Sequence, residues 1–389
     1  MTDLSVDPQT KVLTPPSDSE TTPPALDISN TSLSSSSNVE VDDSDSVRII
    51  LASSSQQCVK FKPENQLDET SSTIDDRIST YTASLTSSVV DYPTEYGRRY
   101  HAFRAGSYLA PNDESEMDRL DLNHMLLMKA IGRKLFLAPV PQASTHRILD
   151  IGTGTGIWAI EAAEVFPNAE ILGNDLSAIQ PSWVPPNVKF EIDDVESRWV
   201  NEKKYDFIFC RYMAGSVVNW PRLMKNIYNN LNPGGWVEFQ DYDITPASDD
   251  DTLTEKHETR KWGEQLIEAC RMVGRDPCPG PKLEGWTRDS GFVDIFHQKF
   301  KLPIGPWSKD PHYKDIGMIN LIQLLHGLDA FSLRTFCGIL GWTREEVIVM
   351  LAQVRKELKS GMFHAHTAIH VVYAQKPQDS KDEEGEAED

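Results

Sequence analysis

The sequence predicts an α/β protein with a mostly parallel, Rossmann-like sheet that carries helices on both faces. A largely apolar run, 148–151, stops at Gly152, Gly154 and Gly156, which are spaced by single threonines, and helical periodicity follows over 157–165. Further apolar runs alternate with helical patterns along the chain, an order typical of parallel sheets. Because glycine lets the backbone turn sharply against a ligand at a helix N-terminus, we expect a nucleotide-like molecule at this loop.

The spacing of the glycines narrows the kind of nucleotide. Dinucleotide-binding folds use Gly-x-Gly-x-x-Gly, whereas this loop reads Gly-x-Gly-x-Gly with Asp150 just before it, and it lacks the Gly-Lys-Ser/Thr of a P-loop. A second strand, 170–177, contains Asp175, where a carboxylate can accept hydrogen bonds from two ribose hydroxyls. A third run, 187–195, also ends in carboxylates. Each motif alone is a weak signal, so an unrelated use of a Rossmann-like sheet remains the alternative.

In this order and spacing, the three motifs resemble the seven-stranded, S-adenosylmethionine-dependent class I methyltransferases, and more narrowly the fungal LaeA-type methyltransferases. The resemblance implies a seven-stranded sheet with an antiparallel last strand and S-adenosyl-L-methionine as the cofactor. It implies that Gly152–Gly156, with Asp150 beside it, cradles the methionine end of the cofactor. Asp175 would then bind the ribose, and Asp194 with the Val195 amide would read the adenine.

A fourth buried strand is predicted at 205–210, and it ends at Arg211, which we expect to face the carboxylate of the cofactor. Methyltransferases that act on adenine or on glutamine amides carry Asn/Asp-Pro-Pro-Tyr/Phe at this place, and this sequence does not. Trp220-Pro221 opens the next helix, which Asn232-Pro-Gly-Gly closes. A fifth strand, 236–240, then leads to Asp241.

The last third of the chain predicts a helix at 252–273, a sixth strand at 292–302 and a seventh at 366–374. Between the last two strands lies an insertion, 307–361, whose final helix begins at a Thr-x-x-Glu capping box and ends near a glycine. Three histidines would share one face at the seventh strand, namely His364, His366 and His370. Since no cysteine or acidic cluster accompanies them, we predict no metal site there.

The region before the first strand, 92–140, is predicted to cap the sheet. Asn112 and Ser115 are candidate helix caps, and the helix is expected to run to Leu137. One face of it carries Met117, Leu120, His124, Leu127 and Ile131. In the family that the sequence resembles, this segment covers the cofactor and part of the substrate pocket. For Tyr100, His101 and Arg104, lining the site and simple packing are equally good interpretations.

The sequence contains no pair of side chains that can be recognised as a catalytic acid and base. Methyl transfer requires the nucleophile to be held about 3 Å from the methyl group, opposite the sulfur, and a base is needed only if the nucleophile arrives protonated. The weak candidates for such a base are His101, His124 and Asp241, and for His124 packing on an apolar face is the better interpretation.

Composition divides the chain into a folded domain, 92–378, and two tails. Residues 1–91 are rich in Ser, Thr, Pro and Asp and are predicted to be disordered, apart from apolar islands at 47–52 and 74–89. They carry 15 acidic and 5 basic side chains, and the C-terminal tail, 379–389, carries 7 and 1. About −5 of the net charge of −21 therefore lies in the domain, which disfavours direct binding of nucleic acid.

The sequence predicts neither a signal peptide nor a membrane span, and its five cysteines include no Cys-x-x-Cys. We therefore expect free thiols and a cytoplasmic and nuclear protein. LaeA-type proteins are linked to velvet-type regulators, so the resemblance implies a methyltransferase that regulates fungal secondary metabolism or development with such partners. The alternatives are a biosynthetic methyltransferase acting on a small-molecule metabolite, or a cofactor-binding scaffold with little activity.

Overall fold

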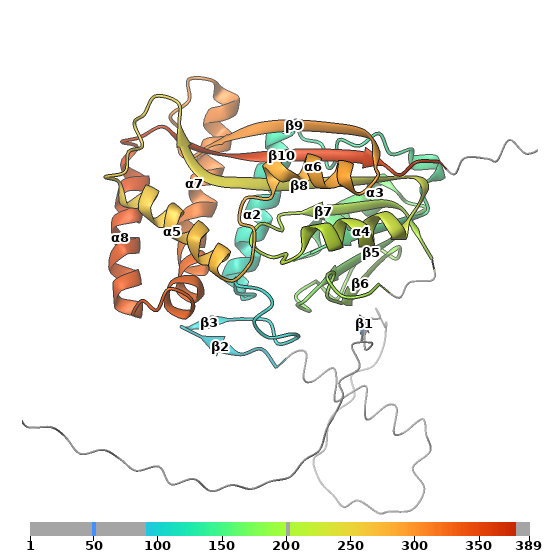
Figure 1. Ribbon diagram of the computed structural model, residues 1–389, viewed down its shortest axis with the longest axis horizontal. Helices are drawn as coiled ribbons and strands as arrows, with labels where there is room; N and C mark the ends of the chain where they lie inside the picture. Colours follow the sequence, from blue (N-terminus) through green and yellow to red (C-terminus); the bar gives the residue numbers. More distant parts are fainter. Residues whose placement is uncertain (1–48, 52–90, 200–202, 379–389) are drawn as a thin grey trace, which may run out of the picture. The chain divides into compact units, whose positions relative to one another are not determined.

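The computed structural model describes residues 49–51, 91–199 and 203–378, and one sheet with the strand order β1-β6-β5-β4-β7-β8-β10-β9 organises them (Figure 1). The strands are β1 (Ile49–Leu51), β4 (Arg147–Ile151), β5 (Glu170–Asp175), β6 (Val188–Ile192), β7 (Tyr205–Arg211), β8 (Leu231–Ser248), β9 (Val293–Pro303) and β10 (Ala365–Gln375). A separate small hairpin pairs β2 (Thr94–Glu95) with β3 (Arg98–Arg99).

The directions of the strands confirm the predicted sheet. β4 pairs in parallel with β5 and β7, and the parallel ladder continues to β6 on one side and β8 on the other. β10 is antiparallel to both β8 and β9, so the last strand of the chain is the reversed one. The sheet also has an eighth, edge strand that was not predicted, since β1 pairs antiparallel with β6.

Helices cover both faces of the sheet. α4 (Trp220–Asn230) and α6 (Leu283–Asp289) lie on one face, and α2 (Glu114–Ala130) and α3 (Ile157–Val165) lie on the other (Figure 1). Trp158 on α3 stacks on Phe209 of β7, with ring centroids 4.0 Å apart. Because the parallel strands are covered on both sides, their carboxyl ends form the edge of the sheet where loops can gather around a ligand.

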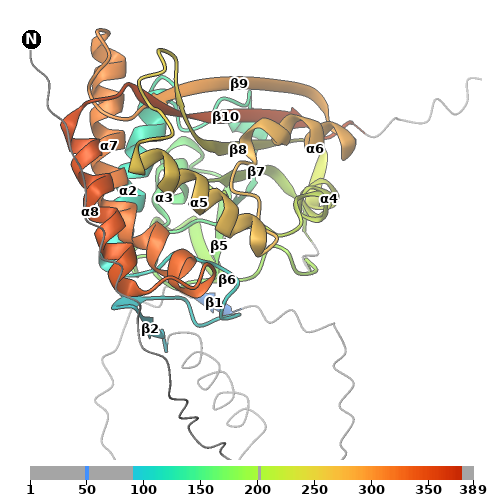
Figure 2. The same cartoon turned by 60° about the vertical axis from the view of Figure 1, so that its left-hand side comes forward.

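A helical group lies beside this sheet, as Figure 2 shows. It consists of α5 (Glu258–Met272), α7 (Pro311–Ser332), a π-helical turn (Leu333–Cys337) and α8 (Arg344–Ser360), which share one apolar core. The predicted capping box of α8 is confirmed, because Thr343 and Glu346 bond each other's backbone amides.

Within the described ranges, the stretch Pro311–Cys337 is long and apolar enough to cross a membrane by length and composition alone. Half of its apolar window is buried inside the protein, and buried Asn320 and Gln323 lie on it. These features are those of a core helix, and we assign α7 to the core of the helical group.

Several predicted boundaries are wrong. Asp113, not Asn112 or Ser115, caps α2, because its carboxylate accepts from the Glu116 amide and also binds Arg98 in a bidentate pair. α2 ends at Ala130 rather than Leu137, since residues 132 and 133 adopt positive φ. α5 begins at 258 rather than 252, and the short helix α6 was not predicted.

The predicted disorder of the tails and the domain boundaries drawn from it lie outside the described residues and stay predictions. Of the two apolar islands, 74–89 also lies outside, whereas 49–51 forms β1. The four cysteines in the described ranges, Cys210, Cys270, Cys278 and Cys337, are free thiols.

Candidate functional site

A cavity of about 200 Å³ lies at the carboxyl ends of the parallel strands. Its walls come from the loop after β4, the ends of β5 and β7, the segment after β6, and the segment 107–112 before α2. The lining residues include Ser107, Tyr108, Asn112, Leu120, His124, Gly152, Thr153, Gly154, Asp175, Ser177, Asp194, Val195, Glu196, Arg211, Tyr212, Met213 and Arg275. Most of the predicted cofactor residues are therefore brought together.

The glycine loop requires glycine at each of its three positions, for different reasons. Gly152, Gly154 and Gly156 all have positive φ, between 57° and 81°, a region that disfavours a side chain. A β-carbon at Gly152 would lie 2.6 Å from the Met213 sulfur, and one at Gly156 would lie 2.4 Å from the Phe190 ring. A β-carbon at Gly154 would make only an ordinary contact with Leu120 at 3.6 Å, so its positive φ is what favours glycine at this position, which lines the cavity.

Asp150 and Gly156 are not among the residues that line the cavity, although both were predicted to bind the cofactor. The Asp150 carboxylate accepts a hydrogen bond of 2.6 Å from the hydroxyl of Thr153, and its burial raises its pKa to about 7. Gly156 begins α3 and makes room for the ring of Phe190. The structure thus places both residues behind the loop, where they hold its shape.

Asp175, the predicted ribose ligand, ends β5 and lines the cavity. One oxygen accepts from the Gly154 amide at 2.9 Å and the other from the Ser177 amide at 3.0 Å. The backbone of Leu176 also bonds this carboxylate, and since a carboxylate has about four acceptor sites, capacity remains for a ribose hydroxyl. Burial raises the pKa of Asp175 to about 6, against the opposing effect of the backbone hydrogen bonds.

Asp194 and Val195 line the opposite part of the cavity. Asp194 accepts from the amide of Glu196 at 2.9 Å and forms an ion pair of 2.8 Å with Arg104. Arg104 comes from the segment before α2, so this pair ties that segment to the loop after β6. The sequence left open whether Arg104 lines the site or packs, and the structure shows it paired with a residue that lines the cavity.

Arg211 belongs to a three-residue chain of hydrogen bonds. Its Nη2 lies 2.7 Å from Nδ1 of His124, and Nε2 of His124 lies 3.1 Å from a carboxylate oxygen of Glu161. Since the guanidinium can only donate, His124 accepts at Nδ1 and donates from Nε2, which is the neutral form. Burial and the charge of Arg211 lower the pKa of His124 to about 3, in keeping with that form. His124 therefore orients Arg211 and is not free to act as a base.

The other two candidate bases are also engaged. Nδ1 of His101 donates to the carbonyl of Phe103 at 2.8 Å, and its Nε2 accepts from the Tyr108 amide at 3.1 Å. The Asp241 carboxylate accepts from three backbone amides, those of Met213, Ala214 and Tyr242, and burial raises its pKa to about 7. The structure assigns both residues to holding loops around the cavity.

The three histidines near β10 do not form one site. His364 pairs with Asp250 at 2.6 Å, His366 with Asp249 at 3.1 Å, and His370 with His297 at 2.7 Å. In the part of the chain that the structure describes, no three His, Cys, Asp or Glu side chains gather as metal ligands.

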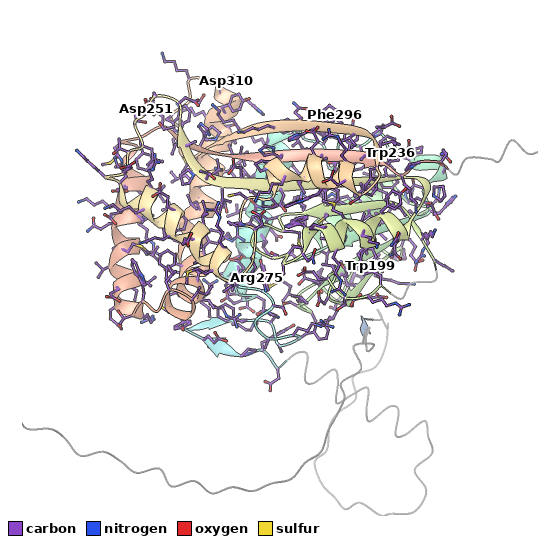
Figure 3. The ribbon with its side chains drawn as sticks, in the orientation of Figure 1. Trp199, Trp236, Asp251, Arg275, Phe296 and Asp310 are labelled. Carbon is purple, nitrogen blue, oxygen red and sulfur yellow. The ribbon has the colours of Figure 1, made fainter. Side chains whose placement is uncertain are left out.

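Sequence reasoning missed Arg275, and it included Tyr108 only as part of the segment expected to cover the cofactor. Arg275 follows α5, and Figure 3 shows it near the end of that helix, beside the segment that precedes α2. It donates to the carbonyls of Ser216 and Gly106, on two sides of the cavity. The carbonyl of Tyr108 accepts from Arg334 at 3.0 Å. No local signal marks these residues, because their partners are distant in sequence.

A second cavity, of about 160 Å³, adjoins the first. Two residues, Tyr108 and Tyr212, line both cavities. The remaining walls of the second cavity come from α2, α5, α7, β8 and β10 and are mostly apolar. The two cavities therefore meet at a pair of tyrosines.

The residues of the first cavity fit S-adenosylmethionine. Nη1 of Arg211 is buried without a hydrogen-bond partner among the described residues, so it can bind the carboxylate of the methionine moiety. Asp175 keeps acceptor sites for the ribose, and Gly154 leaves space for close approach of the ligand. Asp194 and Val195 line the same cavity, and their predicted contact with the adenine stays a prediction.

Comparison with known proteins also indicates a methyltransferase. Residues 96–300 match the family described as a methyltransferase domain. The chain is 46% identical over 295 residues to the methyltransferase pytC of Aspergillus terreus, which covers 76% of this chain and 91% of that protein. It is 40% identical over 291 residues to the secondary metabolism regulator LAE1 of Cochliobolus heterostrophus, covering 73% of this chain and 94% of LAE1.

It is also 36% identical over 287 residues to the protein-methionine methyltransferase laeA of Emericella nidulans, covering 73% of this chain and 76% of that protein. Among solved structures, a phosphoethanolamine N-methyltransferase of Haemonchus contortus, in complex with S-adenosylhomocysteine, matches with a TM-score of 0.40 and 18% identity. That match covers 76% of this chain and 73% of the other.

Proposed function

The chain belongs to the S-adenosylmethionine-dependent methyltransferases of the LaeA type, and we propose that it transfers a methyl group to an acceptor in fungal secondary metabolism. S-Adenosylmethionine is its cofactor. The observation that carries the proposal is the pair of adjoining cavities, one with free groups for a charged nucleotide-like ligand and one suited to an acceptor.

The cofactor supplies an electrophilic methyl group on a sulfonium sulfur. The protein's part is to hold the two ligands in line. Asp175 would bind the ribose hydroxyls and Arg211 the carboxylate, with His124 fixing the direction of the guanidinium. Tyr108 and Tyr212 line both cavities and would flank the line of attack. Such positioning accounts for much of the rate that a methyltransferase needs.

Its biological role, in this proposal, is regulatory. Support comes from the relatives named secondary metabolism regulators, which are 36–40% identical to this chain. The protein would act in the cytoplasm and nucleus with velvet-type protein partners, and it would influence development as well as secondary metabolism. The acidic tails suit protein partners better than nucleic acid, because a phosphate backbone would be repelled.

A second candidate is direct methylation of a small-molecule metabolite. The identity of 46% to pytC, a protein named only as a methyltransferase, exceeds that to the named regulators. The apolar second cavity favours a small acceptor as well. The name of the Emericella nidulans relative offers a third acceptor, a methionine side chain of a protein.

The proposal is tested by pairing chemistry with genetics. Purified protein is incubated with S-adenosylmethionine labelled in its methyl group, together with extract from a strain that lacks the gene, and labelled products are identified. Label in a protein supports the regulatory role, and label in a metabolite supports the biosynthetic one. If a stably folded variant that binds no cofactor restores the deletion strain fully, the protein is a scaffold and the proposal is wrong.

A further inference from the structure

We propose that the second cavity binds the methyl acceptor and that this acceptor is a neutral, largely apolar small molecule bearing a phenolic or enolic hydroxyl. This inference rests on the proposed function, since it concerns the acceptor of the same reaction. The hydroxyl would lie between Tyr108 and Tyr212, where the second cavity meets the cofactor cavity.

The apolar character of the occupant follows from the walls. Leu253, Trp262, Leu266, Leu324 and Phe331 line the second cavity, and they come from the helical group and the loop that leads into it. Transfer of apolar surface from water into such a cavity is favourable by about 25 cal/mol per Å², whereas an unpaired charge would be strongly penalised. The apolar walls thus select against a charge on the part of the acceptor that they enclose.

The polar side chains in the walls confirm this selection, because most already have partners. Arg119, which is 1% exposed, forms a bidentate pair with Glu116, with distances of 2.6 and 2.9 Å. Gln323 accepts from Arg119 at 3.1 Å and donates to Asn320 at 2.9 Å, and Asn320 in turn donates to the carbonyl of Pro303 at 2.9 Å. No net charge is therefore left to recognise an ionic ligand at this place.

The hydroxyl of Tyr212 is a polar group of the wall that keeps a free donor. The Tyr212 hydroxyl accepts a hydrogen bond of 3.2 Å from Arg119, which leaves its own hydrogen to be donated. The neighbouring Tyr242 hydroxyl donates to Asn123 at 2.6 Å, so its hydrogen is already used. Tyr212 has a φ of 60°, a conformation that the Asp241 carboxylate supports by binding the next two amides. The free hydrogen of the Tyr212 hydroxyl would therefore be donated to an oxygen atom of the methyl acceptor.

The kind of hydroxyl follows from the three candidate bases in the described part of the chain, none of which is free. His101, His124 and Asp241 all use their acceptor atoms in hydrogen bonds that shape the cofactor cavity. An aliphatic alcohol would need a base at the reacting oxygen, whereas a hydroxyl on an sp² carbon is acidic enough to lose its proton to solvent. The Tyr212 hydroxyl, polarised by Arg119, would stabilise the resulting oxyanion.

The methyl transfer balances in atoms and charge with only the acceptor, the cofactor and water. The acceptor's hydroxyl proton goes to water, and a lone pair on its oxygen forms the new O–C bond with the methyl carbon. The C–S bond breaks and its electron pair returns to sulfur, giving the neutral thioether of S-adenosylhomocysteine. The products are a methyl ether and that thioether, and no oxidant or metal is required.

The test uses the full chain with 2-naphthol as the probe, an apolar molecule that carries one phenolic hydroxyl. Calorimetry measures 2-naphthol binding in the presence of saturating S-adenosylhomocysteine. The key variant is Leu324→Trp, which fills the second cavity from α7. Its matched control is Leu325→Trp, since Leu325 is the next residue on the same helix, is also partly buried, and lines neither cavity.

We expect the wild type and Leu325→Trp to bind 2-naphthol equally, and Leu324→Trp to bind it at least tenfold more weakly with unchanged S-adenosylhomocysteine affinity. Naphthalene, which lacks the hydroxyl, should bind the wild type more weakly than 2-naphthol does, and Tyr212→Phe should remove that difference. With labelled cofactor, the wild type should form the methyl ether of 2-naphthol faster as pH rises.

The proposal is overturned if S-adenosylhomocysteine binds normally but 2-naphthol does not, or if Leu324→Trp binds it as the control does. It is also overturned if a methionine-containing peptide competes for the second cavity and 2-naphthol does not. Failure of all variants and the wild type to bind S-adenosylhomocysteine would instead contradict the function proposed above, so the two failures are distinguishable.

Discussion

The two adjoining cavities recognise their ligands by opposite means. The first holds carboxylates and a guanidinium that keep free acceptor or donor sites, notably Asp175 and Arg211. In the second, Arg119 is neutralised by Glu116 and the walls are mostly apolar. In the proposed function, charge and hydrogen bonds would select the cofactor, while shape and the cost of desolvation would select the acceptor. Variants in one cavity should therefore leave the ligand of the other bound.

The largest expected effect comes from filling the cofactor cavity at the middle glycine of the loop. Gly154 lines that cavity and a β-carbon there would clash with no protein atom, so Gly154→Arg should project a long side chain into the cavity and weaken S-adenosylhomocysteine binding by at least about a hundredfold. Calorimetry measures the affinity. Gly341→Arg is the control, because it imposes the same left-handed backbone with open space around it and lies in neither cavity.

If Gly341→Arg loses the cofactor as well, backbone strain rather than collision explains the result, and the assignment of Gly154 fails. Binding of 2-naphthol should survive in both variants. Loss of naphthol binding in Gly154→Arg would contradict the claim that the two cavities bind their ligands independently.

A smaller loss is expected when the ribose ligand is removed. Asp175→Ala takes away a charged acceptor for two hydroxyls and should cost roughly 1.5–3 kcal/mol, or about ten- to a hundredfold in affinity for S-adenosylhomocysteine. The measurement is again calorimetry, with Asp249→Ala as the control, since that carboxylate is on the surface and lines neither cavity. An affinity equal to that of the wild type would show that Asp175 does not bind the cofactor.

The same carboxylate predicts a pH dependence. Burial raises the pKa of Asp175 to about 6, and in the proposed function the ribose hydroxyls would donate to its ionised form. Below pH 6 the cofactor must displace a proton, so affinity should fall about tenfold between pH 7 and pH 5 and should be flat above pH 7. Asp175→Asn, which cannot ionise, should show no such change. A wild-type profile that is flat from pH 5 to 7 would contradict this reading of the site.

The smallest effect concerns the residue that orients Arg211. His124→Ala leaves Nη2 of Arg211 without its acceptor, and we expect S-adenosylhomocysteine to bind about three- to tenfold more weakly. Glu161→Gln is the matched control, because the Glu161 side chain is 44% exposed and water can replace it, so its effect should stay within about twofold. Equal losses in the two variants would mean that the whole chain of hydrogen bonds acts as one unit.

The contrast between the cavities also explains what the sequence could predict. Local patterns were enough to predict that the glycine loop, Asp175 and Arg211 lie together. Each of them follows or ends a buried strand, and the carboxyl ends of parallel strands meet at one edge of the sheet. The second cavity uses residues from Tyr108 to Thr367, and no local pattern shows which helix of the helical group faces α2.

Residue type alone also could not predict which polar side chains already form hydrogen bonds within the protein. Asp150 has the type and position of a ligand but bonds Thr153 instead, and Asp241 is used by backbone amides. Likewise, the true cap of α2, Asp113, is fixed by Arg98 of the hairpin, a contact that depends on the fold of the segment before it. Such partners become visible only when the chain is folded.

The most direct test of the whole account is a crystal structure of the full chain with S-adenosylhomocysteine and 2-naphthol. We predict both ribose hydroxyls within hydrogen-bonding distance of the Asp175 carboxylate, the ligand's carboxylate on Nη1 of Arg211, and the naphthol hydroxyl beside Tyr212. The ligand's sulfur should face that hydroxyl across the boundary between the cavities. A ligand bound with its carboxylate away from Arg211, or a naphthol bound outside the second cavity, would contradict the division of roles between the two cavities.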